Sequence, residues 1–163
     1  MRLICLSVSH HNTPVELRES LSLTSDVIDS ALSKSPIREG SFEPILEIVF
    51  LSTCNRLEIY ALVSLQQELD ENLNMIFQPV LTYLREVLEI PTHPIEPYLR
   101  FYRGNSTVEH LFQVAAGLDS IAIGETQILG QVSQALERAL QSGSARHVLA
   151  SLFRSAIHAG KRV

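Results

Sequence analysis

Residues 45–63 read ILEIVFLSTCNRLEIYALV, and this stretch decides the fold expected for the chain. Apart from one glutamate, residues 45–51 are apolar and mostly branched or aromatic, which is typical of a well-buried strand. From Leu57 to Val63, apolar side chains recur at every second position, the period of a second strand. Residues 52–56 between them are small or polar and suit a turn. The sequence therefore predicts a hairpin with Cys54 exposed at its tip.

Hydrophobic periodicity also predicts the elements on either side of this hairpin. A strand over residues 2–9 comes first, and two helices begin near Thr13 and Thr24. A long helix over about residues 68–89, which Pro79 should kink or divide, leads to a fourth strand over 98–102. The order strand, helix, strand, strand, helix, strand is the split βαβ pattern of a ferredoxin-like sheet.

The last third of the chain is predicted to be purely helical. Helices begin near Ser106, near Glu125 and after residues 142–144, where a glycine ends one helix and a serine caps the next. The fold class is therefore α+β, with a ferredoxin-like βαββαβ core in residues 1–104 and a helical segment in residues 105–163. The third helix is still periodic at its end, so we expect the natural chain to continue.

The cysteine content and the hydropathy indicate a cytoplasmic protein. The chain has 163 residues and two cysteines, which supply neither a disulfide framework nor the spacing of a metal site. Cys5 lies in an apolar strand, where a small buried side chain accounts for it. Apolar runs fall short of the ~20 residues that cross a bilayer. A strand that begins at residue 2 leaves no room for a targeting peptide. We expect no metal and no membrane contact.

The charge is uneven along the chain. The net charge is −5, yet residues 126–163 carry five basic side chains and one acidic side chain. Residues 1–125 carry the remaining 8 basic and 17 acidic side chains, so the whole surface does not suit nucleic acid. The basic segment is compatible with a restricted nucleic-acid contact or with a solvated helix face.

Cys54 and Arg56 are the first candidates for chemistry. A cysteine at a turn has the exposure that a thiolate nucleophile needs, although an unreactive surface cysteine fits the pattern equally well. The guanidinium of Arg56 has a planar set of donors suited to a carboxylate. Its plainer interpretation is a salt bridge at the strand end, for instance with Glu58.

His110 is the second candidate. On a helical wheel it lies roughly 140° from the centre of the apolar stripe, so we do not expect a core histidine. Either it is solvated, or it faces a cleft and relays protons near neutral pH. Residues 117–127 form a glycine-bounded loop before the next helix, which is either a plain connector or a site for polar substrate groups.

The glycines form neither GxGxxG nor GxxxxGK[ST]. The chain therefore brings no nicotinamide site and no P-loop of its own.

Three motifs together make the sequence recognisable. They are STCNRLE at 52–58, HLFQVAAGLDS at 110–120 and GETQILGQV at 124–132, with SHHNTP at 9–14 and GKRV at 160–163 near the two ends. With this set of motifs, at these separations, the chain resembles glutamyl-tRNA reductase over nearly its whole length. The resemblance implies an N-terminal catalytic domain of a three-part enzyme, whose NADPH-binding domain and helical dimerisation domain are missing from this chain.

The resemblance also implies a reaction and its residues. Cys54 would attack the ester of glutamyl-tRNA to form a thioester, which NADPH reduces to glutamate-1-semialdehyde for 5-aminolevulinate and tetrapyrrole synthesis. His110 matches a position important for activity. The substrate contacts implied by position are Thr53, Asn55, Arg56, Ser120, Glu125, Thr126, Gln127 and Gln131. Thr126 stands where many members of the family have proline. Implied partners are glutamyl-tRNA, a second subunit bound through the missing domain, and glutamate-1-semialdehyde aminomutase.

Two other functions compete with this one. A stand-alone cysteine esterase would ignore the identity of the acyl group, whereas an Arg56 pocket should reject neutral acyl groups. A non-catalytic module that binds tRNA or a regulator would keep its measurable activity when Cys54 is replaced by serine.

Overall fold

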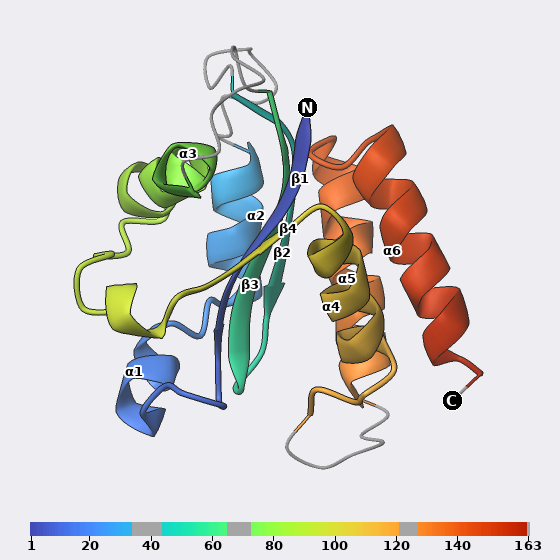
Figure 1. The fold of residues 1–163 in the computed structure, drawn as a ribbon, viewed down its shortest axis with the longest axis horizontal. Coiled ribbons are helices and arrows are strands. Elements are labelled where there is room, and N and C mark those ends of the chain that lie inside the picture. The colour runs from blue at the N-terminus through green and yellow to red at the C-terminus, as the bar shows by residue number, and fades with distance from the viewer. Residues whose placement is uncertain (34–43, 65–72, 121–126, 163) are drawn as a thin grey trace.

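The computed structural model describes residues 1–33, 44–64, 73–120 and 127–162. The fold is α+β, as predicted. A four-stranded antiparallel sheet lies between helices on both of its faces (Figure 1). The strands are β1 (Arg2–Ser9), β2 (Ile45–Ser52), β3 (Arg56–Val63) and β4 (Arg100–Arg103). The helices are α1 (Val15–Ser20), α2 (Ser25–Ser33), α3 (Leu73–Glu86), the 3-10 helix η1 (Glu96–Tyr98), α4 (Asn105–Ala115), α5 (Gln127–Ser142) and α6 (His147–Gly160).

The strand order is β2-β3-β1-β4, and every neighbouring pair is antiparallel. β1 and β3 therefore lie in the middle, in a register that pairs Ser9 with Arg56 and Ser7 with Glu58. β1 keeps its predicted bounds, and β2 and β3 form the predicted hairpin.

Some predicted details of the helices are wrong. α3 runs without interruption through Pro79, so this proline does not divide the helix. Residues 65–72, where the long helix was expected to begin, lie outside the described part of the chain, as does the expected start of α5 at Glu125. α4 begins at Asn105, near its predicted start, and the hydroxyl of Ser106 bonds to the backbone of Arg103.

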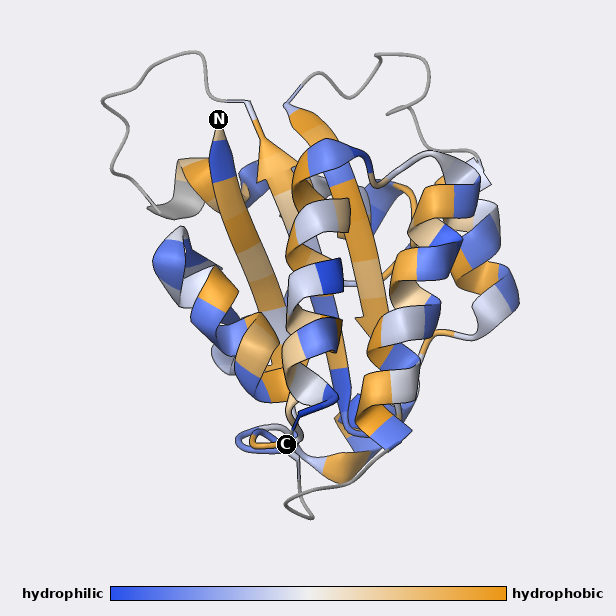
Figure 2. Cartoon of the chain, turned by 90° about the vertical axis from the view of Figure 1, so that its right-hand side faces the viewer, coloured by the Kyte–Doolittle hydropathy of each residue, from blue (hydrophilic) through white to orange (hydrophobic). Residues whose placement is uncertain are grey.

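The sheet carries one hydrophobic core on each face. Alternate residues of the strands, such as Ile4, Ile48 and Ile59, pack against α2 and α3. The opposite face contributes Cys5, Val49, Leu51 and Tyr60 to a second core with α4, α5 and α6. The strands that show between these helices in Figure 2 are hydrophobic over most of their length. Both faces of β3 are consequently buried, although its alternating sequence resembles that of a strand with one solvent-exposed face.

The edge strand β2 is tied to the helical layer by its buried Glu47. This carboxylate accepts hydrogen bonds from the backbone N–H groups of Arg146, Val148 and Leu149 at 2.8–3.0 Å. It thereby satisfies free donors at the N-terminus of α6, where a negative charge is also favoured by the helix dipole. The predicted cap, Ser144, instead turns inward and donates to the carbonyl of Ile48.

Among the described residues, no helix is both long enough and apolar enough to span a bilayer.

Candidate functional site

The turn between β2 and β3 presents Cys54 to solvent, as the sequence predicts. The turn closes on itself through a 2.9 Å bond from the N–H of Thr53 to the carbonyl of Arg56. Asn55 is held from outside, because its carbonyl accepts from the N–H of His10 and its side-chain oxygen accepts from Arg18. The loop after β1 and helix α1 therefore hold the position of the cysteine.

Cys54 opens into a small cavity of about 30 Å³ between this turn and the start of α5. The lining residues are Thr53, Cys54, Asn55, Arg56, Ser120, Gln127, Ile128 and Gln131. Seven of the predicted site residues thus meet at one cavity. Ile128 was not predicted, because it belongs to the apolar stripe of α5 and its sequence pattern marks it only as core. Glu125 and Thr126 lie outside the described residues.

Arg56 is buried and already bound by two carboxylates. Its Nη1 donates to Oε1 of Glu58 at 3.1 Å and to Oδ2 of Asp119 at 2.9 Å. Its Nη2 donates to the backbone carbonyl of Asp119. The plainer interpretation of Arg56 as the partner of Glu58 is therefore confirmed, and Asp119 is a site residue that sequence reasoning missed. The signals for it in the sequence were its place in the motif at 110–120 and in the glycine-bounded loop at 117–127.

Glu58 is the centre of a buried polar cluster below the cavity. Its carboxylate has no exposed surface and accepts hydrogen bonds from Ser7, Arg56, Tyr60 and His110. Burial by itself raises the pKa of this carboxyl, but the bonds and charges of His110, Arg56 and Tyr60 prevail and lower the pKa to about 2. Glu58 is therefore ionised at neutral pH. Because an ionised carboxylate only accepts, Nε2 of His110 carries the shared hydrogen.

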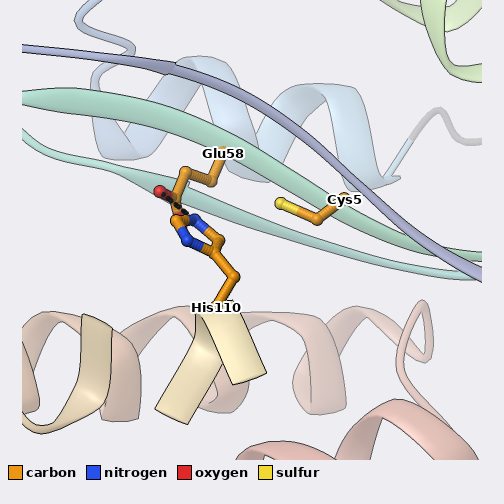
Figure 3. A group of neighbouring side chains, drawn as sticks. All are labelled: Cys5, Glu58 and His110. Atoms are coloured by element: carbon orange, nitrogen blue, oxygen red, sulfur yellow. Dashed lines mark hydrogen bonds and ion pairs between the residues drawn. The ribbon is translucent and has the colours of Figure 1, made fainter. Parts of the chain in front are cut away.

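His110 lies in the core, which contradicts the helical-wheel prediction. It is only 4% exposed, its Nε2 lies 2.9 Å from Glu58, and its ring stacks on Tyr102 at 4.0 Å. Figure 3 shows it pointing from α4 toward Glu58 on β3. The prediction failed because α4 buries two faces, one against the sheet and one against α5 and α6. In the described part of the chain, His110 is not among the residues that line the Cys54 cavity, and its bond to Glu58 links it to Arg56, which does line the cavity.

Cys5 lies beside this pair, and ligand-type atoms of Cys5, Glu58 and His110 lie within 4.8 Å of one another (Figure 3). Four donors already occupy Glu58, and the cation of Arg56 is one of them, which disfavours a dication. Burial, followed by the charge of Glu58, raises the pKa of the Cys5 thiol well above its usual range. We interpret the cluster as a hydrogen-bonded network and Cys5 as an unreactive core residue, as its sequence context suggests.

His10 and His11 flank the site from the loop after β1. His11 Nε2 lies 2.9 Å from Oδ1 of Asp119, so it contacts the same carboxylate that binds Arg56. Burial, together with the charges of His11 and Arg56, lowers the pKa of His10.

Comparison with known proteins identifies the family. A model of the N-terminal domain of glutamyl-tRNA(Glu) reductase matches residues 6–163. The chain belongs to the glutamyl-tRNA reductase family. It is 36% identical to the glutamyl-tRNA reductase of Bacillus velezensis over 162 residues, which cover 99% of this chain and 33% of that protein. The enzyme of Prochlorococcus marinus is 36% identical over 163 residues, 100% of this chain and 35% of its own length.

A solved structure agrees with this assignment. Glutamyl-tRNA reductase from Methanopyrus kandleri superposes with a TM-score of 0.69 at 29% identity, over 98% of this chain and 33% of that one. The chain therefore spans about a third of the length of the reductases that it matches, and it corresponds to their N-terminal domain.

Proposed function

We propose that this chain is the catalytic domain of a glutamyl-tRNA reductase and that Cys54 is its nucleophile. The composition of the Cys54 cavity carries the proposal. The β2–β3 turn supplies four of the residues expected to contact a glutamyl group, and residues 120–131 supply three more from a distant part of the sequence. This convergence on an exposed thiol, in a chain of this family, supports acyl transfer to Cys54.

In the proposed step, the Cys54 thiolate attacks the carbonyl carbon of the ester that joins glutamate to tRNA. The C–S bond forms as the C–O bond to the ribose breaks, and the released ribose oxygen takes a proton from water. The glutamyl thioester is more electrophilic than the ester and stays attached to the protein when the tRNA leaves.

We assign Arg56 to the side-chain carboxylate of the glutamyl group, since a guanidinium binds carboxylates through two parallel bonds. The other polar groups of the cavity, Thr53, Asn55, Ser120, Gln127 and Gln131, are assigned to the remaining polar atoms of the substrate. Glu125 and Thr126 keep the same assignment from the sequence alone.

We assign His110 as a positioning residue and not as the group that transfers protons at the ester. Its bond to Glu58 fixes the carboxylate that in turn holds Arg56. This indirect role fits a buried ring that does not line the cavity.

In the full-length enzyme, the thioester on Cys54 would be reduced with hydride from NADPH to glutamate-1-semialdehyde, the precursor of 5-aminolevulinate and tetrapyrroles. The described residues do not fit a dinucleotide, because their sheet is antiparallel throughout and no glycine-rich fingerprint follows a strand. We therefore assign NADPH binding and homodimer formation to the parts of the full-length enzyme outside this chain. Binding of glutamate-1-semialdehyde aminomutase and a cytoplasmic location complete the proposal.

We also propose a division of the chain at residue 104. The strand order β2-β3-β1-β4, with antiparallel neighbours, supports a ferredoxin-like core in residues 1–104. In the second part, residues 105–163, the helices α4, α5 and α6 form the layer on the second face of the sheet, and α5 supplies Gln127 and Gln131 to the cavity.

The test is covalent labelling with glutamyl-tRNA charged with radioactive glutamate. We expect the purified 163-residue chain to retain label after denaturation and Cys54→Ala to retain none, because only Cys54 offers an exposed thiol. The matched control is Cys5→Ala, which removes the buried thiol and should label like the unmodified chain. Aldehyde is scored separately, and we expect none even when NADPH is added.

Two outcomes would contradict the proposal. Equal labelling by alanyl-tRNA would favour a general cysteine esterase. Label that persists in Cys54→Ala would exclude Cys54 as the nucleophile.

A further inference from the structure

Asp119 covers the guanidinium of Arg56 from the loop that follows α4. Its side chain and its backbone carbonyl each accept a hydrogen bond from that guanidinium. The side chain of Arg56 is only 2% exposed as a result. A ligand carboxylate in the Cys54 cavity therefore cannot pair with Arg56 while Asp119 stays in place.

The charges make simple addition of a third carboxylate unfavourable. The single positive charge of Arg56 already faces the carboxylates of Glu58 and Asp119. A ligand carboxylate at the same guanidinium would stand among two like charges in a largely buried place, where repulsion is strong. One of the two protein carboxylates must leave before a ligand carboxylate binds.

Asp119 is the carboxylate that is able to leave. Glu58 has no exposed surface and is held by four donors from β1, β3 and α4. The side chain of Asp119 is 20% exposed and lies on a connecting loop instead of a central strand. Its other oxygen is bound by His11, which is itself 42% exposed. Asp119 therefore keeps a partner when it releases Arg56.

The position of Arg56 points the same way. Arg56 is among the residues that line the Cys54 cavity. A guanidinium released by Asp119 therefore becomes available to a ligand in this cavity.

We propose that Asp119 is a specificity-determining gate, which binds Arg56 in the free protein and yields it only to a ligand that brings its own carboxylate. An acyl group with a neutral side chain gives Arg56 no replacement for the ion pair, so the gate stays closed against it. This inference rests on the proposed function, because the glutamyl side chain is the ligand that opens the gate.

The experiment is an NMR titration of the 163-residue chain with two small probes. L-Isoglutamine has an amidated α-carboxyl and a free side-chain carboxylate, and L-glutaminamide is its counterpart with a neutral side chain. We expect the unmodified chain to bind isoglutamine in preference to glutaminamide. Asp119→Asn removes the competing charge but keeps the side-chain shape, so it should bind isoglutamine about tenfold more tightly, the equivalent of about 1.4 kcal/mol. Its affinity for glutaminamide should not change.

Asp119→Ser serves as a second charge-removing variant should Asp119→Asn unfold, and thermal unfolding of every variant checks for loss of structure.

The outcomes separate the gate from the proposed function. The proposal of a gate would be overturned if Asp119→Asn or Asp119→Ser folds and binds isoglutamine no more tightly than the unmodified chain. Asp119 would then be a structural partner of Arg56. If Cys54 is nevertheless labelled by glutamyl-tRNA, the proposed function stands. If neither labelling nor isoglutamine binding occurs, both proposals fall.

Discussion

The carboxylate of Glu58 has no contact with solvent, yet hydrogen bonds and charges from its neighbours hold its pKa at about 2, below its usual 4.5. A carboxyl whose pKa is lower in the folded state stabilises the fold above its unfolded pKa. This contribution is lost as the pH falls toward the folded-state value. Glu58 should therefore stabilise the protein fully at neutral pH and progressively less in acid.

Glu58→Gln should lower the free energy of unfolding at neutral pH by about 3 kcal/mol, since it removes the central carboxylate of a buried charge network and leaves Arg56 with Asp119 alone as a charged partner. The difference between this variant and the unmodified chain should shrink as the pH falls through the range from about 4.5 to about 2. Urea denaturation at a series of pH values measures this difference. Glu16→Gln, at an exposed position on α1, is the control for loss of one charge. A difference that stays constant down to the acid limit would mean that Glu58 is not held ionised.

At the scale of single residues, the sequence predicted the edge of the site better than its interior. The turn at residues 52–56 and the exposure of Cys54 were predicted because strand pattern and turn chemistry are local properties. Thr53 and Asn55 became candidates for substrate contact only through the family resemblance. His110 was placed wrongly and Asp119 was not named as a candidate, since their partners lie 52 and 63 residues away in the sequence. No local pattern tells whether a polar side chain on a helix meets water or a buried carboxylate.

The helical layer is closely packed where α6 passes α4. A Cβ atom at Gly160 would meet the carbonyl group of Ala115, with the carbonyl carbon 2.9 Å away, and Cδ1 of Leu129 at the same distance. Backbone atoms cannot yield as a flexible side chain does. The approach of the two helices therefore requires glycine at this point.

Gly160→Ala should lower the free energy of unfolding by about 1–3 kcal/mol through this overlap. The matched control is Gly130→Ala on α5, where nothing lies within 4 Å of the added methyl group. Alanine there should stabilise the fold by about 0.5–1 kcal/mol, because glycine is a poor residue for a helix interior. Thermal unfolding of the two variants compares them directly. A stable Gly160→Ala variant would show that the end of α6 moves away from α4 without cost.

At the scale of elements, periodicity predicted which segments are strands and which are helices, but not how their ends are satisfied. Glu47 looked like an ordinary residue of β2, yet it caps α6 across 99 residues of sequence. Ser144 has a good local pattern for a cap and bonds to β2 instead. Helix ends are completed by whichever donor or acceptor the packing brings near, and this is a tertiary property.

The whole molecule depends on covering both faces of one sheet. The sequence predicted a sheet domain followed by helices, but it did not predict that β3 would be buried on both sides. The period-2 pattern of β3 arises because one face carries the aliphatic residues Leu57, Ile59 and Ala61. The other face carries Glu58 and Tyr60, which are polar in the sequence but buried by α4, α5 and α6. In the sequence, a buried polar network of this kind gives the same alternating pattern as a strand with one solvent-exposed face.

A chain truncated after residue 104 should therefore fail to fold alone, even though it contains the complete sheet. It would expose the second core face, including Val49, Leu51 and Tyr60, and it would remove the hydrogen bond of His110 to Glu58. Burial of apolar surface contributes about 25 cal/mol per Å². The stabilising free energy lost with a whole helical layer therefore exceeds the few kcal/mol by which a domain is stable. Near-UV circular dichroism and size-exclusion chromatography, with the 163-residue chain as control, provide the measurement. We expect no fixed aromatic environment and a strong tendency to aggregate. A monomeric fragment with a cooperative unfolding transition would show instead that the sheet and its first helical layer form an independent unit.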